Sequence, residues 1–410
     1  MMMPSRANLR LTLRRAKRML EFLGYGLLDR RVLQAAGTMP PVQGRTVIVH
    51  LELLGDFFLW LPFGRALAGA LLRQGHEVIL VCPPEFAPLV VREIPGCQVA
   101  AVDRKRFVRN WTYRVSSLRK LRCLAPSQTF AMSYPRDGII TDAVVRALAA
   151  PAATGWAAEF SDRPGWDRAA GRRAFTHLLA PLPHAHQHRR HAEFLGACGV
   201  QPPQPPKVTE RNQPAEQTRA GRYFLIAPGA SRMFRSWPPG RFAALARRIL
   251  QRHPSWRCIV VGTAAERDLA QSVAAEIGPA AVNRAGETQP KTLLDLIAGA
   301  SLVLGNDSAA GHIAAYCGTS SVVAVGGGHF GRCYPYDSAA SPGVAMPVTV
   351  HEHMACFGCD WICRYRTATN EPYPCLQAIS VEAMWSAVEP LLAPDRQPTT
   401  STDQESETQR

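Results

Sequence analysis

The chain has 410 residues, 47% hydrophobic and 19% charged, which is enough apolar material for two or three globular domains. This composition excludes a disordered or fibrous protein. Lysine and arginine outnumber aspartate and glutamate by 47 to 32, and the formal charge of +15 favours anionic partners. No apolar run is long enough to span a bilayer and the N-terminus lacks a signal-peptide pattern, so together with the scattered cysteines the sequence predicts a cytoplasmic protein.

Residues 1–44 form a basic extension with an amphipathic pattern. Leucines recur at three- and four-residue steps up to Leu27, and basic side chains lie between them. Such a helix either rests on an anionic bilayer or packs its apolar stripe on the protein's own core. The sequence leaves both alternatives open.

Short β-branched runs alternate with helical patterns from residue 45 onwards. The expected strands are Thr46–Leu51, Glu77–Val81, Gln98–Val102 and Thr129–Met132, and helices are expected from the Gly55 turn to Leu72 and over Thr141–Ala150. Residues 45–200 are therefore predicted to form one open α/β domain.

A polar, proline-rich stretch at residues 201–221 is the predicted linker, after which the alternation starts again. The expected strands there are Tyr223–Ala227, Arg257–Val261, Ser301–Leu304 and Ser321–Val325, and the expected helices are Pro239–Arg252, Ala265–Ile277, Lys291–Ala298 and Ala309–Tyr316. Residues 222–392 are thus predicted to be a second Rossmann-like domain, and the polar residues 393–410 a disordered tail.

Ligands of open α/β sheets bind beyond the carboxyl ends of the strands, so the turns from strand to helix are the candidate sites. In the first turn, Asp56 is either a general base or a plain helix cap. In the second, Gly229 and Ser231 can approach a phosphate while Arg235 supplies positive charge, unless this is an ordinary loop with solvated arginines.

The third and fourth turns also contain groups that suit a nucleotide. Glu266 can bind a ribose hydroxyl pair or simply stabilise a helix dipole. The fourth turn runs from a strand into a helix start made of small residues, where free N–H groups make an anion site unless Asp307 or Ser308 merely caps the helix. His312 either touches the same ligand or fills the helix–sheet interface.

In this order, the four turns resemble glycosyltransferase family 9, the bacterial lipopolysaccharide heptosyltransferase family. The similar segments are Ala227-Pro-Gly-Ala-Ser231, Arg235-Ser-Trp-Pro-Pro239 and Gly305-Asn-Asp-Ser-Ala-Ala-Gly-His-Ile-Ala-Ala315, with Gly55-Asp56 near the start. The resemblance covers roughly residues 45 to 385. It implies an α/β GT-B fold, in which two Rossmann-like domains face each other across a cleft and bind the acceptor and the nucleotide sugar.

The resemblance also implies roles for single residues. Asp56 matches the general base of an inverting, metal-independent transfer, and Arg235 stands where the family usually has a lysine beside the donor diphosphate. Glu266 matches the nucleoside-binding acid. The remaining donor-site residues that it implies are Gly229, Ser231, Asn306, Asp307, Ser308, Ala309, Ala310 and His312. No cofactor is expected beyond the nucleotide-diphosphate sugar, which is a co-substrate.

The first expectation is therefore transfer of heptose from ADP-heptose to a lipopolysaccharide core or a related cell-surface glycan. Its partners would be an anionic, lipid-linked acceptor and the inner face of the cytoplasmic membrane, with no nucleic acid. The loop Gly326–Arg332 departs from the family's Gly-Pro-Thr-Asp and leaves the transferred sugar open. The alternatives are a different nucleotide-sugar donor, a nucleotide-sugar epimerase and a non-catalytic glycan-binding scaffold.

Two further clusters are prominent in the sequence. Cys356, Cys359, Cys363 and Cys375 suit zinc, a disulfide or buried reduced thiols, but the spacing lacks the paired knuckles of a zinc ribbon. His184, His186, His188 and His191 are expected to form a solvated cationic face rather than a metal site.

Overall fold

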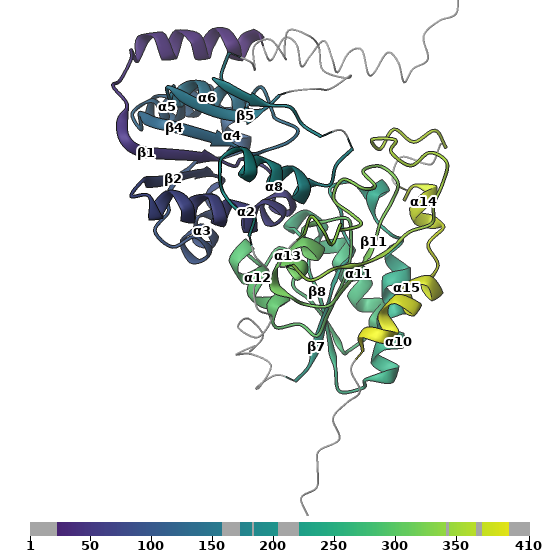
Figure 1. Cartoon of the computed structure of the whole chain (residues 1–410). Helices are drawn as coiled ribbons and strands as arrows, with labels where there is room; N and C mark the ends of the chain where they lie inside the picture. The colour runs from purple at the N-terminus through teal and green to yellow at the C-terminus, as the bar shows by residue number, and fades with distance from the viewer. Residues whose placement is uncertain are drawn as a thin grey trace, which may run out of the picture.

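The computed structural model describes residues 23–157, 173–182, 184–203, 221–341, 344–365 and 371–392. Most of the predicted linker, the predicted tail and the first 22 residues of the basic extension lie outside the described residues. The described chain forms two parallel six-stranded sheets with helices packed around them (Figure 1). No helix in the described ranges is long and apolar enough to cross a membrane.

The first sheet has the strand order β3-β2-β1-β4-β5-β6, and every neighbouring pair is parallel. Its strands are β1 (Val42–Val49), β2 (Glu77–Cys82), β3 (Gln98–Ala101), β4 (Pro126–Ala131), β5 (Ala152–Trp156) and β6 (His177–Leu179). The accompanying helices are α2 (Leu54–Arg73), α3 (Ala87–Glu93), α4 (Arg104–Arg109), α5 (Trp111–Arg122), α6 (Thr141–Leu148) and α8 (Gln187–Ala197). The strand order reverses beside β1, which is where open sheets leave a crevice for ligands.

Helices cover both faces of this sheet because alternate side chains of its buried strands point to opposite sides. Ile48 of β1 packs in the cluster that contains α2, α3 and α8, whereas Val47 and Val49 pack with α4, α5 and α6. The N-terminal helix (residues 23–35) joins the second cluster through the buried Val32. The described part of the basic extension therefore packs on the protein's own core.

The second sheet repeats the same arrangement, with the order β12-β11-β10-β7-β8-β9. Its strands are β7 (Tyr223–Ala227), β8 (Arg257–Val260), β9 (Ala281–Asn283), β10 (Leu302–Asn306), β11 (Ser321–Ala324) and β12 (Val348–Val350). Its helices are α10 (Pro239–Arg252), α11 (Arg267–Ile277), α12 (Pro290–Ala298), α13 (Ala309–Cys317), α14 (Pro374–Gln377) and α15 (Val381–Val388). The two sheets confirm the α/β class predicted from the sequence.

The two halves meet where α2 packs against α13. A Cβ atom placed on Gly55 would lie 3.3 Å from His312 Cδ2 and 3.5 Å from Ala309 Cα, so this contact leaves room for little more than glycine. This contact brings the turn that contains Gly55 and Asp56 beside the turn from β10 into α13.

The prediction of a solvated histidine face is wrong. His186, His188 and His191 are buried, and only His184 of the four is exposed. A ring nitrogen of His186 lies 2.9 Å from the Cys333 carbonyl oxygen, and His188 Nδ1 lies 2.7 Å from Ser341 Oγ. Burial lowers the pKa of His191 to about 3, so its ring is uncharged. The histidines fill the interface with residues of the second half that lie far away in the sequence.

Candidate active site

Asp56 lies in the first turn of α2, directly after the carboxyl end of β1. The N-cap residue of α2, Leu53, makes no side-chain hydrogen bond, and the Asp56 carboxylate instead accepts a hydrogen bond from the Leu53 backbone N–H. Asp56 therefore supports the helix start, as the simpler alternative predicted. It also lines a pocket, which leaves the general-base role available.

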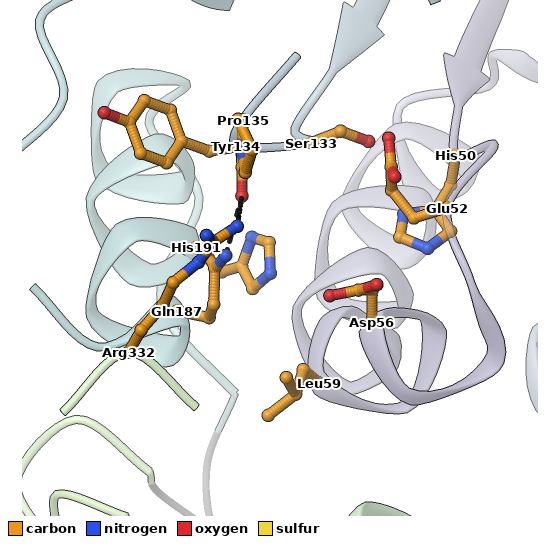
Figure 2. A pocket seen from close by; sticks show the side chains of 10 residues that line it. All are labelled: His50, Glu52, Asp56, Leu59, Ser133, Tyr134, Pro135, Gln187, His191 and Arg332. Carbon is orange, nitrogen blue, oxygen red and sulfur yellow. Dashed lines mark hydrogen bonds between the residues drawn. The ribbon is translucent and has the colours of Figure 1, made fainter. Parts of the chain in front are cut away.

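This pocket has a volume of about 110 Å³ and lies at the carboxyl edge of the first sheet (Figure 2). Its wall is made by residues of three segments of the first half and by Arg332 of the second half: His50, Glu52, Asp56, Leu59, Ser133, Tyr134, Pro135, Gln187, His191 and Arg332. Gln187 Nε2 donates to the Tyr134 carbonyl oxygen at 2.6 Å, and Arg332 Nη2 donates to the same oxygen at 3.5 Å.

Several buried polar atoms around the pocket have no hydrogen-bond partner in the described chain. They include both ring nitrogens of His50, Glu52 Oε1, Ser133 Oγ, Gln187 Oε1 and Arg332 Nε. Buried polar atoms in native proteins are nearly always paired, with protein, water or a ligand. A small cavity lined by unpaired donors and acceptors suits a polar ligand rich in hydroxyl groups.

Two carboxyl groups in the pocket have raised pKa values. Burial raises the pKa of Glu52 to about 7, against the opposing charge of Arg104. Burial also raises the pKa of Asp56, opposed mainly by Arg332 and Arg104. A carboxylate whose pKa is raised toward neutrality is a stronger base than a solvated one, which is the property that proton abstraction needs.

The donor-side loop after β7 is fixed by a residue of β10. Asn306 is fully buried, and its Oδ1 accepts a hydrogen bond from the Trp237 backbone N–H at 2.7 Å. Its Nδ2 donates to the carbonyl oxygens of Pro228 at 2.8 Å and Gly229 at 3.2 Å. Asn306 was predicted to bind the donor, but its amide is engaged with this loop, so we assign it the role of positioning the loop.

Arg235 is held from three sides above this loop. Its guanidinium donates to Ser231 Oγ at 3.1 Å and to Asp307 Oδ2 at 3.5 Å, and it lies 4.5 Å above the centre of the Trp361 ring. Arg235 Nε is buried without a partner. The predicted residues Ser231, Arg235 and Asp307 are thus brought together in one cluster.

The N-terminus of α13 has no side-chain cap. Its N-cap residue Ser308 makes no side-chain hydrogen bond, and Asp307 contacts Arg235 instead, so neither residue caps the helix. The first N–H groups, near Ala309 and Ala310, are therefore available to an anion. Burial and the nearby Asp56 raise the pKa of Asp307, whereas Arg235 opposes this shift.

His312 and Glu266 are each engaged in protein contacts. His312 is buried, its Nδ1 lies 2.7 Å from the Tyr336 hydroxyl, and its ring stacks on Tyr334, which favours the interface-filling alternative. Glu266 completes a capping box in which its Oε2 accepts from the Thr263 backbone N–H at 2.7 Å and from its hydroxyl at 2.8 Å. A Cβ on Gly229 would overlap the Glu266 carboxylate, so the acid lies against the donor-side loop.

The glycine-rich loop after β11 is packed under the cysteine segment. Cβ atoms at Gly327 and Gly328 would overlap the rings of Phe357 and Trp361. The backbone also pairs there, since Gly358 N donates to the Gly327 carbonyl oxygen at 2.8 Å and Asp360 N to that of Gly328 at 3.0 Å. Glycine at these two positions leaves the room that the Phe357 and Trp361 rings occupy.

The four cysteines of this segment are free thiols, so the disulfide alternative is not adopted. Burial raises the pKa of the Cys359 and Cys375 thiols. Within the described ranges, no three His, Cys, Asp or Glu side chains come together in a way that could hold a metal ion. The described arrangement therefore does not fit a zinc or iron centre, and we derive no chemistry from one.

Sequence reasoning did not select Glu52, His50, His191, Gln187 or Arg332 as site residues. Glu52 precedes Asp56 by four residues and lies next to the turn that the sequence identified. Of these five residues, it is the one that the position of this turn could have revealed. Gln187 is brought to the pocket by the packing of α8 on α2, and Arg332 by the packing of the second half on the first.

Comparison with known proteins gives a family and a fold. The family model described as glycosyltransferase family 9 (heptosyltransferase) matches residues 137–339. No curated protein sequence matches the chain significantly.

Three solved structures illustrate the fold. A glycosyl transferase family 9 protein from Veillonella parvula is 18% identical, with a TM-score of 0.62 over 87% of this chain and 99% of its own. The E. coli heptosyltransferase WaaC with ADP is 17% identical, with a TM-score of 0.60 over 85% of this chain and 100% of its own. TibC from E. coli, an iron-containing dodecameric glycosyltransferase, is 15% identical, with a TM-score of 0.51 over 86% of this chain and 79% of its own.

These similarities confirm the GT-B fold expected from the sequence. The family match over residues 137–339 identifies the chain as a glycosyltransferase that resembles family 9, the heptosyltransferase family.

Proposed function

We propose that this protein transfers a sugar, with heptose from ADP-heptose as the first candidate, to a hydroxyl group of a lipopolysaccharide core or a related cell-surface glycan. The reaction inverts the anomeric carbon, needs no metal and takes place at the cytoplasmic face of the inner membrane. The observation that carries the proposal is the contact between Gly55 and the start of α13, because it sets Asp56 beside Asp307 and Arg235.

In this reaction the Asp56 carboxylate takes the proton of the acceptor hydroxyl while the hydroxyl oxygen attacks the anomeric carbon. The bond from that carbon to the diphosphate oxygen breaks at the same time, and the electron pair leaves with the diphosphate. Arg235 and the uncapped N–H groups of α13 stabilise the developing negative charge without a metal. The pocket of about 110 Å³ holds the part of the acceptor that carries the hydroxyl.

The choice of donor is supported only by similarity. WaaC has been solved with ADP and with ADP-2-deoxy-2-fluoro heptose. The test is a thermal-shift panel of ADP, UDP, GDP and CMP with their sugar conjugates, because a ligand that binds only the folded state raises the melting temperature. Stabilisation by ADP and ADP-heptose that EDTA leaves unchanged is expected. A preference for another nucleotide would refute ADP-heptose, and a loss of activity with EDTA would refute metal independence.

The role of Asp56 is tested by Asp56→Asn, with Glu85→Gln as the matched control. Glu85 is an exposed carboxylate of the same half, outside the pocket. A general base contributes on the order of 10²- to 10⁴-fold, so transfer by Asp56→Asn is expected to fall by about that factor while the nucleotide-induced thermal shift persists. Turnover equal to that of the control would remove Asp56 from the mechanism.

A further inference from the structure

A second cavity lies on the opposite face of the first sheet from α2. It has a volume of about 740 Å³ and is bounded by the N-terminal helix and the turn after it, the end of α5, α6 and the segment before β6. In Figure 1 the N-terminal helix runs along the outer side of α5 and α6, on the far side of the first sheet from the second half. The cavity is therefore separate from the pocket that holds Asp56.

Four guanidinium groups line this cavity, those of Arg30, Arg122, Arg146 and Arg173, and we call it the arginine cavity. Among the described residues that line it, Asp29 contributes the only carboxylate. That carboxylate is already neutralised, because Arg114 Nε and Nη2 each donate to it at 2.6 Å from inside the core. The described lining residues thus carry a surplus of positive charge.

The arginines of this cavity have few protein partners. Arg146 Nη2 lies 4.0 Å from Asp29 Oδ2, and no ion pair between described residues includes Arg30, Arg122 or Arg173. Arg122 Nε is buried and makes no hydrogen bond. Burial lowers the pKa values of both Arg122 and Arg146. Two of these arginines, Arg122 and Arg146, are half-buried, and Arg30 and Arg173 are exposed beside them. Four arginines gathered at one cavity, with a single neutralised carboxylate among the described lining residues, suit an anion that comes from outside.

We propose that the arginine cavity binds a phosphate group. Guanidinium groups match phosphate oxygens through paired, charge-assisted hydrogen bonds, which a single halide ion cannot accept in the same number. The phosphate belongs either to a soluble phosphorylated compound or to a phospholipid headgroup. The adjoining helix exposes Leu23 by 51% and Leu27 by 64%, which would suit a lipid surface beside the phosphate.

The test compares two triple variants of the full chain with equal net charge. The site variant is Arg30→Gln, Arg122→Gln and Arg173→Gln. The charge control is Arg109→Gln, Arg252→Gln and Arg257→Gln, whose arginines are exposed and lie outside the cavity. Pyrophosphate is titrated into wild type and both variants by calorimetry at constant ionic strength. Each protein is also sedimented with phosphatidylglycerol–phosphatidylcholine vesicles and with phosphatidylcholine vesicles alone.

The site variant is expected to lose one pyrophosphate-binding site, or to bind pyrophosphate at that site at least tenfold more weakly. The control is expected to bind pyrophosphate as wild type does. Weaker sedimentation of the site variant with the anionic vesicles, with or without the pyrophosphate effect, would identify the ligand as a lipid headgroup. A loss for pyrophosphate alone would identify a soluble phosphate compound. Equal behaviour of the site variant and the control with both probes would overturn the proposal.

A single substitution keeps the test independent of folding. Because Arg122 Nε is buried without a hydrogen-bond partner in the described chain, Arg122→Gln is expected to raise the melting temperature in phosphate-free buffer and to reduce the further rise that pyrophosphate produces. A variant that melts below wild type in that buffer and responds to pyrophosphate as wild type does would contradict the inference.

Discussion

Glu52 and Asp56 share one pocket but occupy different electrostatic surroundings. Arg104 and Arg332 lie near both carboxyl groups, but Asp56 accepts a backbone hydrogen bond, whereas Glu52 Oε1 has no hydrogen-bond partner in the described chain. Burial therefore raises the pKa of Glu52 to about 7. A carboxyl group with this pKa is partly protonated near neutral pH, so Glu52 can donate a hydrogen bond inside the pocket.

The sign of the Glu52 effect on stability follows from its pKa. The carboxyl is neutral in the folded chain up to about pH 7, whereas in the unfolded chain it ionises near the ordinary value of 4.5. Its contribution to stability is full below pH 4.5 and is lost as the pH rises through 7. Relative to wild type, Glu52→Gln is expected to gain up to about 3 kcal/mol between pH 4.5 and pH 8. Urea unfolding of both proteins at these pH values checks this, and a constant difference would contradict the raised pKa.

At the scale of elements, the cysteine segment and the glycine-rich loop form one unit beside the donor site. Trp361 lies on Gly328 and also faces the Arg235 guanidinium, so this segment supports a residue that we assign to the diphosphate. Phe234 stacks on Tyr373 with ring centres 4.5 Å apart, which ties the donor-side loop to the same segment. The glycine-rich loop and the cysteine segment therefore support, through packing, the residues that we propose for the donor site.

This arrangement predicts that Gly328→Ala forces the Trp361 ring away from the loop. Overpacking of this kind costs about 1–3 kcal/mol. The melting temperature is expected to fall and the donor KM to rise, because Arg235 loses the ring beneath it. Gly196→Ala is the control, since nothing lies within 4 Å of a Cβ placed there. If the two variants have the same melting temperature and the same donor KM, the contact between Trp361 and Gly328 contributes neither to stability nor to donor binding.

At the scale of the whole molecule, uncharged histidines occupy the contact between the two halves. Burial lowers the pKa values of His191 and His312 to about 3, and it also lowers those of His186 and His188. In the folded protein these histidines stay unprotonated. In the unfolded chain they take up protons once the pH falls below about 6.5. The raised pKa values of Glu52, Asp56 and Asp307 act in the opposite direction, but these carboxyl groups are fewer.

The protein is therefore expected to lose stability as the pH falls from 7 to 5. Each buried histidine contributes up to about 1.4 kcal/mol per pH unit in this range. Melting temperatures of wild type and of His188→Gln/His191→Gln at pH 7.5, 6.5 and 5.5 check the origin of the loss. The double variant is expected to have the shallower pH dependence, whatever its stability at pH 7.5. Parallel curves would exclude these histidines as the cause.

The sequence by itself determined the fold class and the positions of the turns that we propose for the chemistry. Hydrophobic periodicity is local, so β7 and α10 have the bounds predicted for them, and parallel strands place their turns at one edge of the sheet. Short strands such as β9 and β12 carry too few alternating residues for this signal, and they were not predicted.

Only the tertiary structure decided what each polar residue contacts. The same histidine pattern suits a solvated face or a buried interface. Contacts with residues 330–341 of the second half bury these histidines in the interface. Arg332 reaches the Asp56 pocket, Asn306 is engaged by the donor-side loop, and the N-terminal helix assembles the arginine cavity through contacts across long stretches of sequence. Burial and charge surroundings arise from such contacts, and a linear pattern of residue types does not encode them.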